Sequence, residues 1–152
     1  MTTILCPTRG GKESQANQDF AINLAIEREA DLMFLYVSNI QLLSRAGPPI
    51  VVDIEEELDE LGDFLLSMAQ ERAEKIGVTA RAEVRRGIFS DVLKEVIVEN
   101  EVETVVLGSS PQNTSGLVSF EHLQEMSQEL SKEMGVEFII VQDGKVAFQT
   151  AA

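Results

Sequence analysis

The chain has 152 residues, the usual size of one domain, and its 44% apolar and 25% charged residues are typical of a globular protein rather than a disordered one. Twelve Lys and Arg residues against 26 Asp and Glu residues give a formal net charge of −14. This charge argues against DNA or RNA as a partner, because nucleic-acid binding needs a basic face, and no apolar segment is long enough to predict a membrane partner.

Short β-rich segments alternate with amphipathic segments along the chain, which is typical of a parallel sheet with helices on both faces. The predicted strands are 3–6, 32–37, 78–85, 104–107 and 138–141. The predicted helices are the segments with residues on one face at helical spacing: Ala16, Phe20 and Leu24; Leu58, Leu61, Leu65 and Met68; Ile88, Val92 and Val96; and Phe120, Leu123, Ser127, Leu130 and Met134. We therefore predict an α/β fold, a Rossmann-like doubly wound five-stranded parallel sheet in the order 3-2-1-4-5 with four helices.

The two outer strands of this predicted sheet differ in character. The third strand alternates apolar and polar residues, as expected of a half-exposed edge. The fifth strand, Phe138, Ile139, Ile140 and Val141, is wholly apolar and carries no charge or proline, so another element should cover it. We predict that a second copy of the chain covers it, and that this C-terminal edge strand is used for dimerisation.

A single domain is expected over residues 1–152, with a core of about 1–142 and a C-terminal tail at 143–152. Residues 145–148 alternate after an Asp-Gly turn, and they could add a short strand to the dimer contact. Phe148 in this tail either covers the dimer edge or contacts another protein.

A ligand site in an open α/β sheet is expected at the carboxyl ends of the strands where the strand order reverses. Here these ends are followed by the loops after the first and fourth strands, which are rich in glycine and hydroxyl groups. The candidate crevice consists of Pro7, Thr8, Arg9, Gly10, Lys12, Gly108, Ser109, Ser110 and Gly116, with Glu121 and His122 at the start of the fourth helix. No metal site is predicted, because the acidic segment 53–63 reads as a solvated helix face whose carboxylates splay apart.

The sequence resembles the universal stress protein family in the order and spacing of several segments. These segments are ILCPTRGG at the front, the Arg86-Gly87 turn before the third helix, VVLGSS across the end of the fourth strand, and the final FIIV. The resemblance covers nearly the whole chain and implies a Rossmann-like fold that is usually dimeric. Many members of that family bind ATP through the pattern Gly-x-x-Gly, nine residues, then Gly with Ser or Thr, and an aspartate in the first loop reaches the adenine.

The chain departs from this ATP-binding pattern at each discriminating position. Gly108 matches the first glycine, but Pro111 stands at the second, and Glu121-His122 replaces the Gly-Ser pair. Arg9 stands where the aspartate is expected, so a donor replaces the acceptor that an adenine amino group needs. Proline offers no N–H to a phosphate, and Glu121 would repel one. These changes predict a degenerate nucleotide site and no ATP cofactor.

Other interpretations of the same loops stay open. Arg9 and Lys12 beside Gly10 could hold a small anion, and the hydroxyl groups around Ser109 could hold a nucleotide in an altered pose. Alternatively, these residues only close turns and cap the fourth helix.

Cys6 and His122 form the one cysteine-containing pair that could suggest a hydrolase. Cys6 ends an apolar strand, where a free cysteine usually acts as a small buried apolar group, and neither Gly-x-Ser-x-Gly nor a Walker loop is present. We therefore predict a stress-response or regulatory binding module that acts as a homodimer and not as an enzyme. A lone free thiol and the lack of a signal-like segment before the first strand predict a cytoplasmic location.

Overall fold

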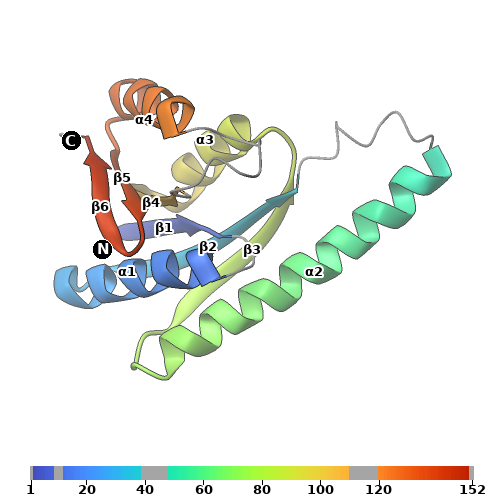
Figure 1. Cartoon of the computed structure of the whole chain (residues 1–152), viewed down its shortest axis with the longest axis horizontal. Helices are drawn as coiled ribbons and strands as arrows, with labels where there is room; N and C mark the ends of the chain where they lie inside the picture. The colour runs from blue at the N-terminus through green and yellow to red at the C-terminus, as the bar shows by residue number, and fades with distance from the viewer. Residues whose placement is uncertain (1, 9–11, 39–47, 110–119, 151–152) are drawn as a thin grey trace.

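The computed structural model of the chain describes residues 2–8, 12–38, 48–109 and 120–150, and within them strands and helices alternate until two strands end the chain (Figure 1). In chain order the elements are β1 (Thr3–Pro7), α1 (Lys12–Arg28), β2 (Asp31–Ser38), α2 (Pro48–Glu74), β3 (Ala80–Arg86), α3 (Phe89–Asn100), β4 (Val102–Gly108), α4 (Phe120–Met134), β5 (Glu137–Gln142) and β6 (Lys145–Gln149). All five predicted strands and all four predicted helices are present.

One sheet contains all of these strands, in the order β3-β2-β1-β4-β5-β6. Strands β1 to β5 are parallel and keep the predicted order 3-2-1-4-5, whereas β6 runs antiparallel to β5. Strand β1 is central and almost fully buried, because its aliphatic side chains are covered on both faces. Strand β3 is the predicted half-exposed edge, with most of its side chains only partly buried.

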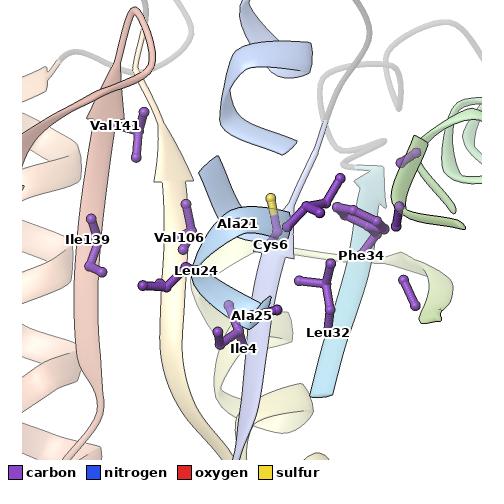
Figure 2. Close-up of a cluster of buried hydrophobic side chains, with 14 of the residues drawn as sticks. Ile4, Cys6, Ala21, Leu24, Ala25, Leu32, Phe34, Val106, Ile139 and Val141 are labelled. Atoms are coloured by element: carbon purple, nitrogen blue, oxygen red, sulfur yellow. The ribbon is translucent and has the colours of Figure 1, made fainter. Parts of the chain in front are cut away.

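Two apolar clusters fill the spaces between the sheet and its helices. On one face, α1 and α2 cover alternate strand residues that include Ile4, Cys6 and Phe34 (Figure 2). On the other face, α3 and α4 cover residues that include Leu5 and Phe138. Neighbouring residues of β1 therefore enter different clusters, as the alternation of side chains along a strand requires.

Helix α2 buries a different face from the predicted one. The structure buries Gly62, Leu66, Ala69 and Ala73, whereas Leu61 and Met68 of the predicted core face are exposed and Leu65 is half-buried. The reason is the close approach of α2 to the sheet: a Cβ at Gly62 would lie 2.6 Å from Cδ1 of Tyr36 on β2. Small residues allow this approach, and larger apolar residues are left beside the contact. Leu58 lies outside the residues whose side chains the structure describes.

Helices α3 and α4 bury most of their predicted faces. Val92 and Val96 of α3 are buried, but Ile88 precedes the helix at its N-cap and is exposed. In α4 the predicted residues Leu123, Ser127 and Leu130 are buried, and Phe120 and Met134 pack partly against the same cluster.

The prediction that β5 forms the edge of the sheet is wrong, because β6 pairs with it. Asp143 and Gly144 both adopt positive φ values, of 53° and 76°, and this turn folds the tail back onto β5 (Figure 1). Phe138 N–H donates to Thr150 Oγ1 at 2.8 Å, and Thr150 N–H donates to the Phe138 carbonyl at 2.9 Å. The tail of the same chain thus provides the cover that was expected from a second copy, and Phe138, Ile139, Ile140 and Val141 are all buried.

Glu137, at the start of β5, joins several elements at the amino end of this strand. Its carboxylate accepts hydrogen bonds from Arg28 of α1 at 2.7 Å, Thr104 of β4 at 3.0 Å and Gln149 of β6 at 2.7 Å. Partial burial alone would raise the pKa of Glu137, but these hydrogen bonds outweigh burial and hold the pKa below its ordinary value. The charged form of Glu137 therefore stabilises the fold.

Glu137→Gln is expected to reduce the dependence of stability on acid pH. A lowered folded-state pKa means that the contribution of Glu137 is complete above the ordinary value of 4.5 and is lost as the pH falls through the folded-state value. Urea unfolding from neutral to acid pH should show a smaller loss of stability in this variant than in the parent. Arg28→Gln removes the cation that pairs with Glu137, so stability should also depend less on acid pH in this variant. Identical plots of stability against pH for the parent and both variants would contradict the stabilising role of the charged Glu137.

Candidate functional site

The strand order reverses between β1 and β4, which lie side by side at the centre of the sheet. Both strands run in the same direction, so their carboxyl ends at Pro7 and Gly108 reach the same edge of the sheet (Figure 1). Helix α1 starts just beyond β1, at Lys12. Open α/β sheets hold ligands at such a point. We refer to Pro7, Thr8, Gly108 and Ser109 as the switch-point residues.

The backbone amides of Thr8 and Ser109 are already engaged within the fold. Thr8 N–H donates to the carbonyl of Leu35 on β2 at 2.8 Å, and Ser109 N–H donates to the carbonyl of Val141 on β5 at 2.9 Å. The Thr8 hydroxyl also accepts a hydrogen bond of 2.6 Å from Nε2 of Gln18 on α1. Both residues are buried, and these bonds extend the sheet beyond β1 and β4 rather than presenting free N–H groups to an anion.

Asn17 occupies the space directly above Gly108. A Cβ built on Gly108 would lie 1.5 Å from Nδ2 of Asn17 and 2.5 Å from its Cγ. A side chain at position 108 would therefore have to displace the amide of Asn17. Sequence reasoning missed Asn17, because a polar residue within a polar helix turn gives no periodic signal.

Gly108→Ala is expected to destabilise the protein by about 1–2 kcal/mol, since the new methyl group must displace the Asn17 side chain. Asn17→Ala opens the space, so the double variant Asn17→Ala with Gly108→Ala should recover most of the loss. Urea unfolding of the two single variants and the double variant gives the coupling free energy. Strictly additive effects would show that the amide of Asn17 does not restrict position 108.

The remaining candidate residues divide into two groups. Arg9, Gly10, Ser110 and Gly116 lie outside the described residues, as does the side chain of Lys12. Glu121 and His122 lie in the first turn of α4, and both are exposed.

Ser38 is a further polar residue at the carboxyl edge of the sheet, and it is not among the predicted crevice residues. It ends β2, the strand next to β1, and it is buried. Its hydroxyl oxygen has no hydrogen-bond partner, although its carbonyl accepts from Gly87 N–H at 3.0 Å. A buried hydroxyl without a partner is costly, and Ser38 is an unsatisfied polar group at the end of the strand that adjoins β1.

An open hollow of about 300 Å³ lies elsewhere, along the exposed side of α1 and beside Gly144 of the β5–β6 turn. Asp19 and Glu27 both line it, so the hollow is unsuited to a phosphate or another anion. Asp19 also accepts a hydrogen bond of 2.7 Å from Arg72 of α2. The hollow is therefore distinct from the predicted crevice and does not extend it.

Cys6 and His122 belong to opposite layers of the fold. Cys6 is fully buried in the cluster beneath α1 (Figure 2), whereas α4, which carries His122, packs against the other face of the sheet. Burial raises the pKa of the Cys6 thiol to about 12, which opposes formation of the reactive thiolate. The geometry therefore argues against a Cys-His dyad.

The described part of the chain contains no cluster of three or more His, Cys, Asp or Glu side chains placed to hold a metal ion. Within the same residues, no helix combines the length and apolarity needed to cross a membrane.

Comparison with models of protein families shows which family has a sequence like this one. The model of the "Universal stress protein family" matches residues 1–137, which include β1 to β4, α1 to α4 and the first residue of β5. The chain belongs to the universal stress protein family. No curated protein matches its sequence significantly.

Solved structures of universal stress proteins share this fold at low sequence identity. Universal stress protein UspA from Lactobacillus plantarum has 18% identity and a TM-score of 0.72, with 92% of this chain and 97% of that chain covered. A family protein from Burkholderia pseudomallei has 20% identity and a TM-score of 0.69, with 92% and 95% covered. An Arabidopsis thaliana family protein with AMP bound has 16% identity and a TM-score of 0.59, with 93% and 92% covered. At these identities the likeness is one of fold.

Proposed function

We propose that this universal stress protein is a cytoplasmic stress-response or regulatory binding module with a degenerate nucleotide site, and that it acts as a homodimer and not as an enzyme. The observation that carries the proposal is the contact between Asn17 and Gly108, because it fills the space above the one glycine that matches the family's ATP-binding pattern. The engaged amides of Thr8 and Ser109 support the same conclusion, since an anion cradle depends on free N–H donors.

The sequence changes around this contact agree with loss of ATP binding. Pro111 cannot donate a backbone N–H, and the exposed carboxylate of Glu121 would repel a phosphate brought to the first turn of α4. Arg9 replaces the expected adenine acceptor. In this chain, the Asn17 side chain therefore fills the space above Gly108, and the carboxylate of Glu121 is unfavourable for a phosphate. Its activity is binding through other surfaces.

Homodimerisation is proposed through the outer edge of β6 rather than through β5. Strand β6 is the last strand of the sheet, so the N–H and C=O groups on its outer side are available to pair with a second copy. Val146 on this strand is 48% exposed. Phe148, the one predicted dimer residue that lies on β6, packs partly against the core and supports the strand from within.

A nucleotide or small-anion sensor is the second candidate function, and Ser38 is the observation that favours it. Its buried hydroxyl lacks a partner at the edge where ligands bind in this fold class. The Arabidopsis thaliana relative has AMP bound, so a ligand of that class is a reasonable candidate for an altered pose here.

Thermal unfolding of the purified, nucleotide-free protein with magnesium ATP, ADP, AMP and inorganic phosphate separates these functions. A ligand at a hundred times its dissociation constant adds about 2.7 kcal/mol to stability. We expect no shift with any of the four compounds. A shift specific to a nucleotide would overturn the degenerate-site proposal, and one shared with phosphate would favour the anion sensor. Asn17→Ala should be measured in parallel, because a shift that appears only in this variant would identify the Asn17 amide as the group that excludes the ligand.

A further inference from the structure

Helix α2 carries an apolar stripe that nothing in the described fold covers. Leu61 is 47% exposed, Phe64 is 62% exposed and Met68 is 42% exposed, while Leu65 between them is half-buried. We call these four residues the α2 stripe. Their spacing of three and four residues places them in one row along the helix.

The α2 stripe is separate from the face that holds α2 to the sheet. That contact uses Gly62, Leu66, Ala69 and Ala73, which are buried against β2 and β3. Apolar residues therefore cover a wider arc of α2 than the sheet requires. Other exposed large apolar residues, such as Ile26 on α1 and Val98 on α3, lie on separate elements and do not continue this row. A contiguous exposed apolar row is a mark of a protein-binding surface.

The form of α2 makes this row accessible to a partner. The amino-terminal part of the helix extends away from the sheet and the other helices, whereas its carboxyl-terminal part packs against the body (Figure 1). The α2 stripe lies near the middle of the helix, so a second helix could lie along it.

Charge indicates what kind of helix would bind there. Helix α2 carries nine Asp and Glu residues and one basic residue, Arg72. Glu60, Asp63 and Glu71 are exposed on the same helix as the stripe. A second copy of α2 would bring two strongly acidic helices together, and an anionic lipid surface would be repelled in the same way. A partner with basic residues beside its apolar row would instead gain from both kinds of contact.

We propose that the α2 stripe is a docking surface for a basic amphipathic helix of another protein. The apolar row of that helix would pack on Leu61, Phe64 and Met68, and its Lys or Arg residues would face exposed carboxylates of α2 such as Glu60 and Glu71. This inference adds a class of partner to the proposed binding function. It rests on one part of that function, namely that the chain acts by binding another protein.

The test uses the full chain and a synthetic helical peptide of leucine and lysine in a heptad pattern, with fluorescence anisotropy as the measure of binding. We expect the parent to bind this peptide and Leu61→Gln with Met68→Gln to weaken binding about tenfold or more, because exposed anchors at the centre of an interface carry most of its energy. Val98→Gln is the matched control, as Val98 is 69% exposed on α3 and outside the stripe. Circular dichroism should be unchanged in both variants, since each substituted residue is exposed.

Charge is tested with a second peptide in which glutamate replaces every lysine. Binding to the lysine peptide only, weakened by salt, supports the proposal. Absence of binding by the parent, equal binding of both peptides, or an equal loss in Val98→Gln would overturn it. Sedimentation that detects self-association abolished by the stripe variant would identify a second copy as the occupant and would also overturn it. None of these outcomes depends on nucleotide binding, so failure here is distinct from failure of the proposed degenerate site.

Discussion

Ile140→Lys is expected to unfold the protein or to lower its free energy of unfolding by about 4 kcal/mol or more, because it places an ammonium group in the core. Ile140 is fully buried on β5, between Leu107 of β4 and Phe148 of β6. It belongs to the apolar cluster that also contains Leu5 and Phe138, so a lysine there would stand among hydrocarbon side chains. A loss of this size is a large part of the stability of a typical domain. Circular dichroism and urea unfolding measure it.

Val98→Lys is the matched control for this substitution, since the same charge then stands on an exposed position of α3. It should change stability by no more than about 0.5 kcal/mol. A folded Ile140→Lys protein that had only lost self-association would show that β5 is an exposed dimer edge and that β6 does not cover it.

Removal of residues 143–152 is expected to cost roughly 2–4 kcal/mol and to cause self-association. The truncation removes the partly buried ring of Phe148 and the backbone bonds between Phe138 and Thr150. It also turns β5, whose residues 138–141 are all apolar, into an open edge, which is a template for pairing with other chains. Thermal unfolding and sedimentation velocity would detect the two effects separately.

Val146→Lys is the control for the truncation because it keeps β6 in place. Val146 is exposed on the outer strand, so the variant should stay folded and should not form larger assemblies. If β6 is the dimer edge, the added charge should also shift the protein toward the monomer. A truncated protein with the stability and sedimentation of the full chain would refute the stabilising role of β6.

Residue patterns predicted the sheet well because they report local periodicity. Continuous apolar runs such as 104–107 identified strands buried on both faces, and the alternation in the third strand correctly indicated an edge. The order 3-2-1-4-5 came from the arrangement of a Rossmann-like half, and the half-exposed pattern of the third strand supported it because that order places this strand at an edge. The strands themselves depend on neighbouring residues, so one sequence is enough to derive them, whereas their order also needed the known arrangement of this fold class.

The contacts around the candidate site were predicted less completely than the sheet. The pattern placed Thr8 and Ser109 correctly at the ends of β1 and β4, since the topology brings these ends to one edge. It did not reveal that their amides bond to β2 and β5, nor that Asn17 lies over Gly108. These contacts join segments that are far apart in the chain, and no periodicity records the distance between them.

The amino-acid sequence by itself determined the α/β class, the strand order and the acidic character of this universal stress protein. Only the tertiary structure decided which face of α2 is buried, because two rows of residues are both consistent with a helix. One row contains Leu61 and Met68, which are seven residues apart, and the other contains the small residues Gly62 and Ala69. The choice between them depends on how closely the helix can approach Tyr36, and small residues allow the shorter distance. The same holds for β6: its alternation predicts a strand, but pairing within the chain prevails because a tight turn holds it beside β5 at little cost in chain entropy.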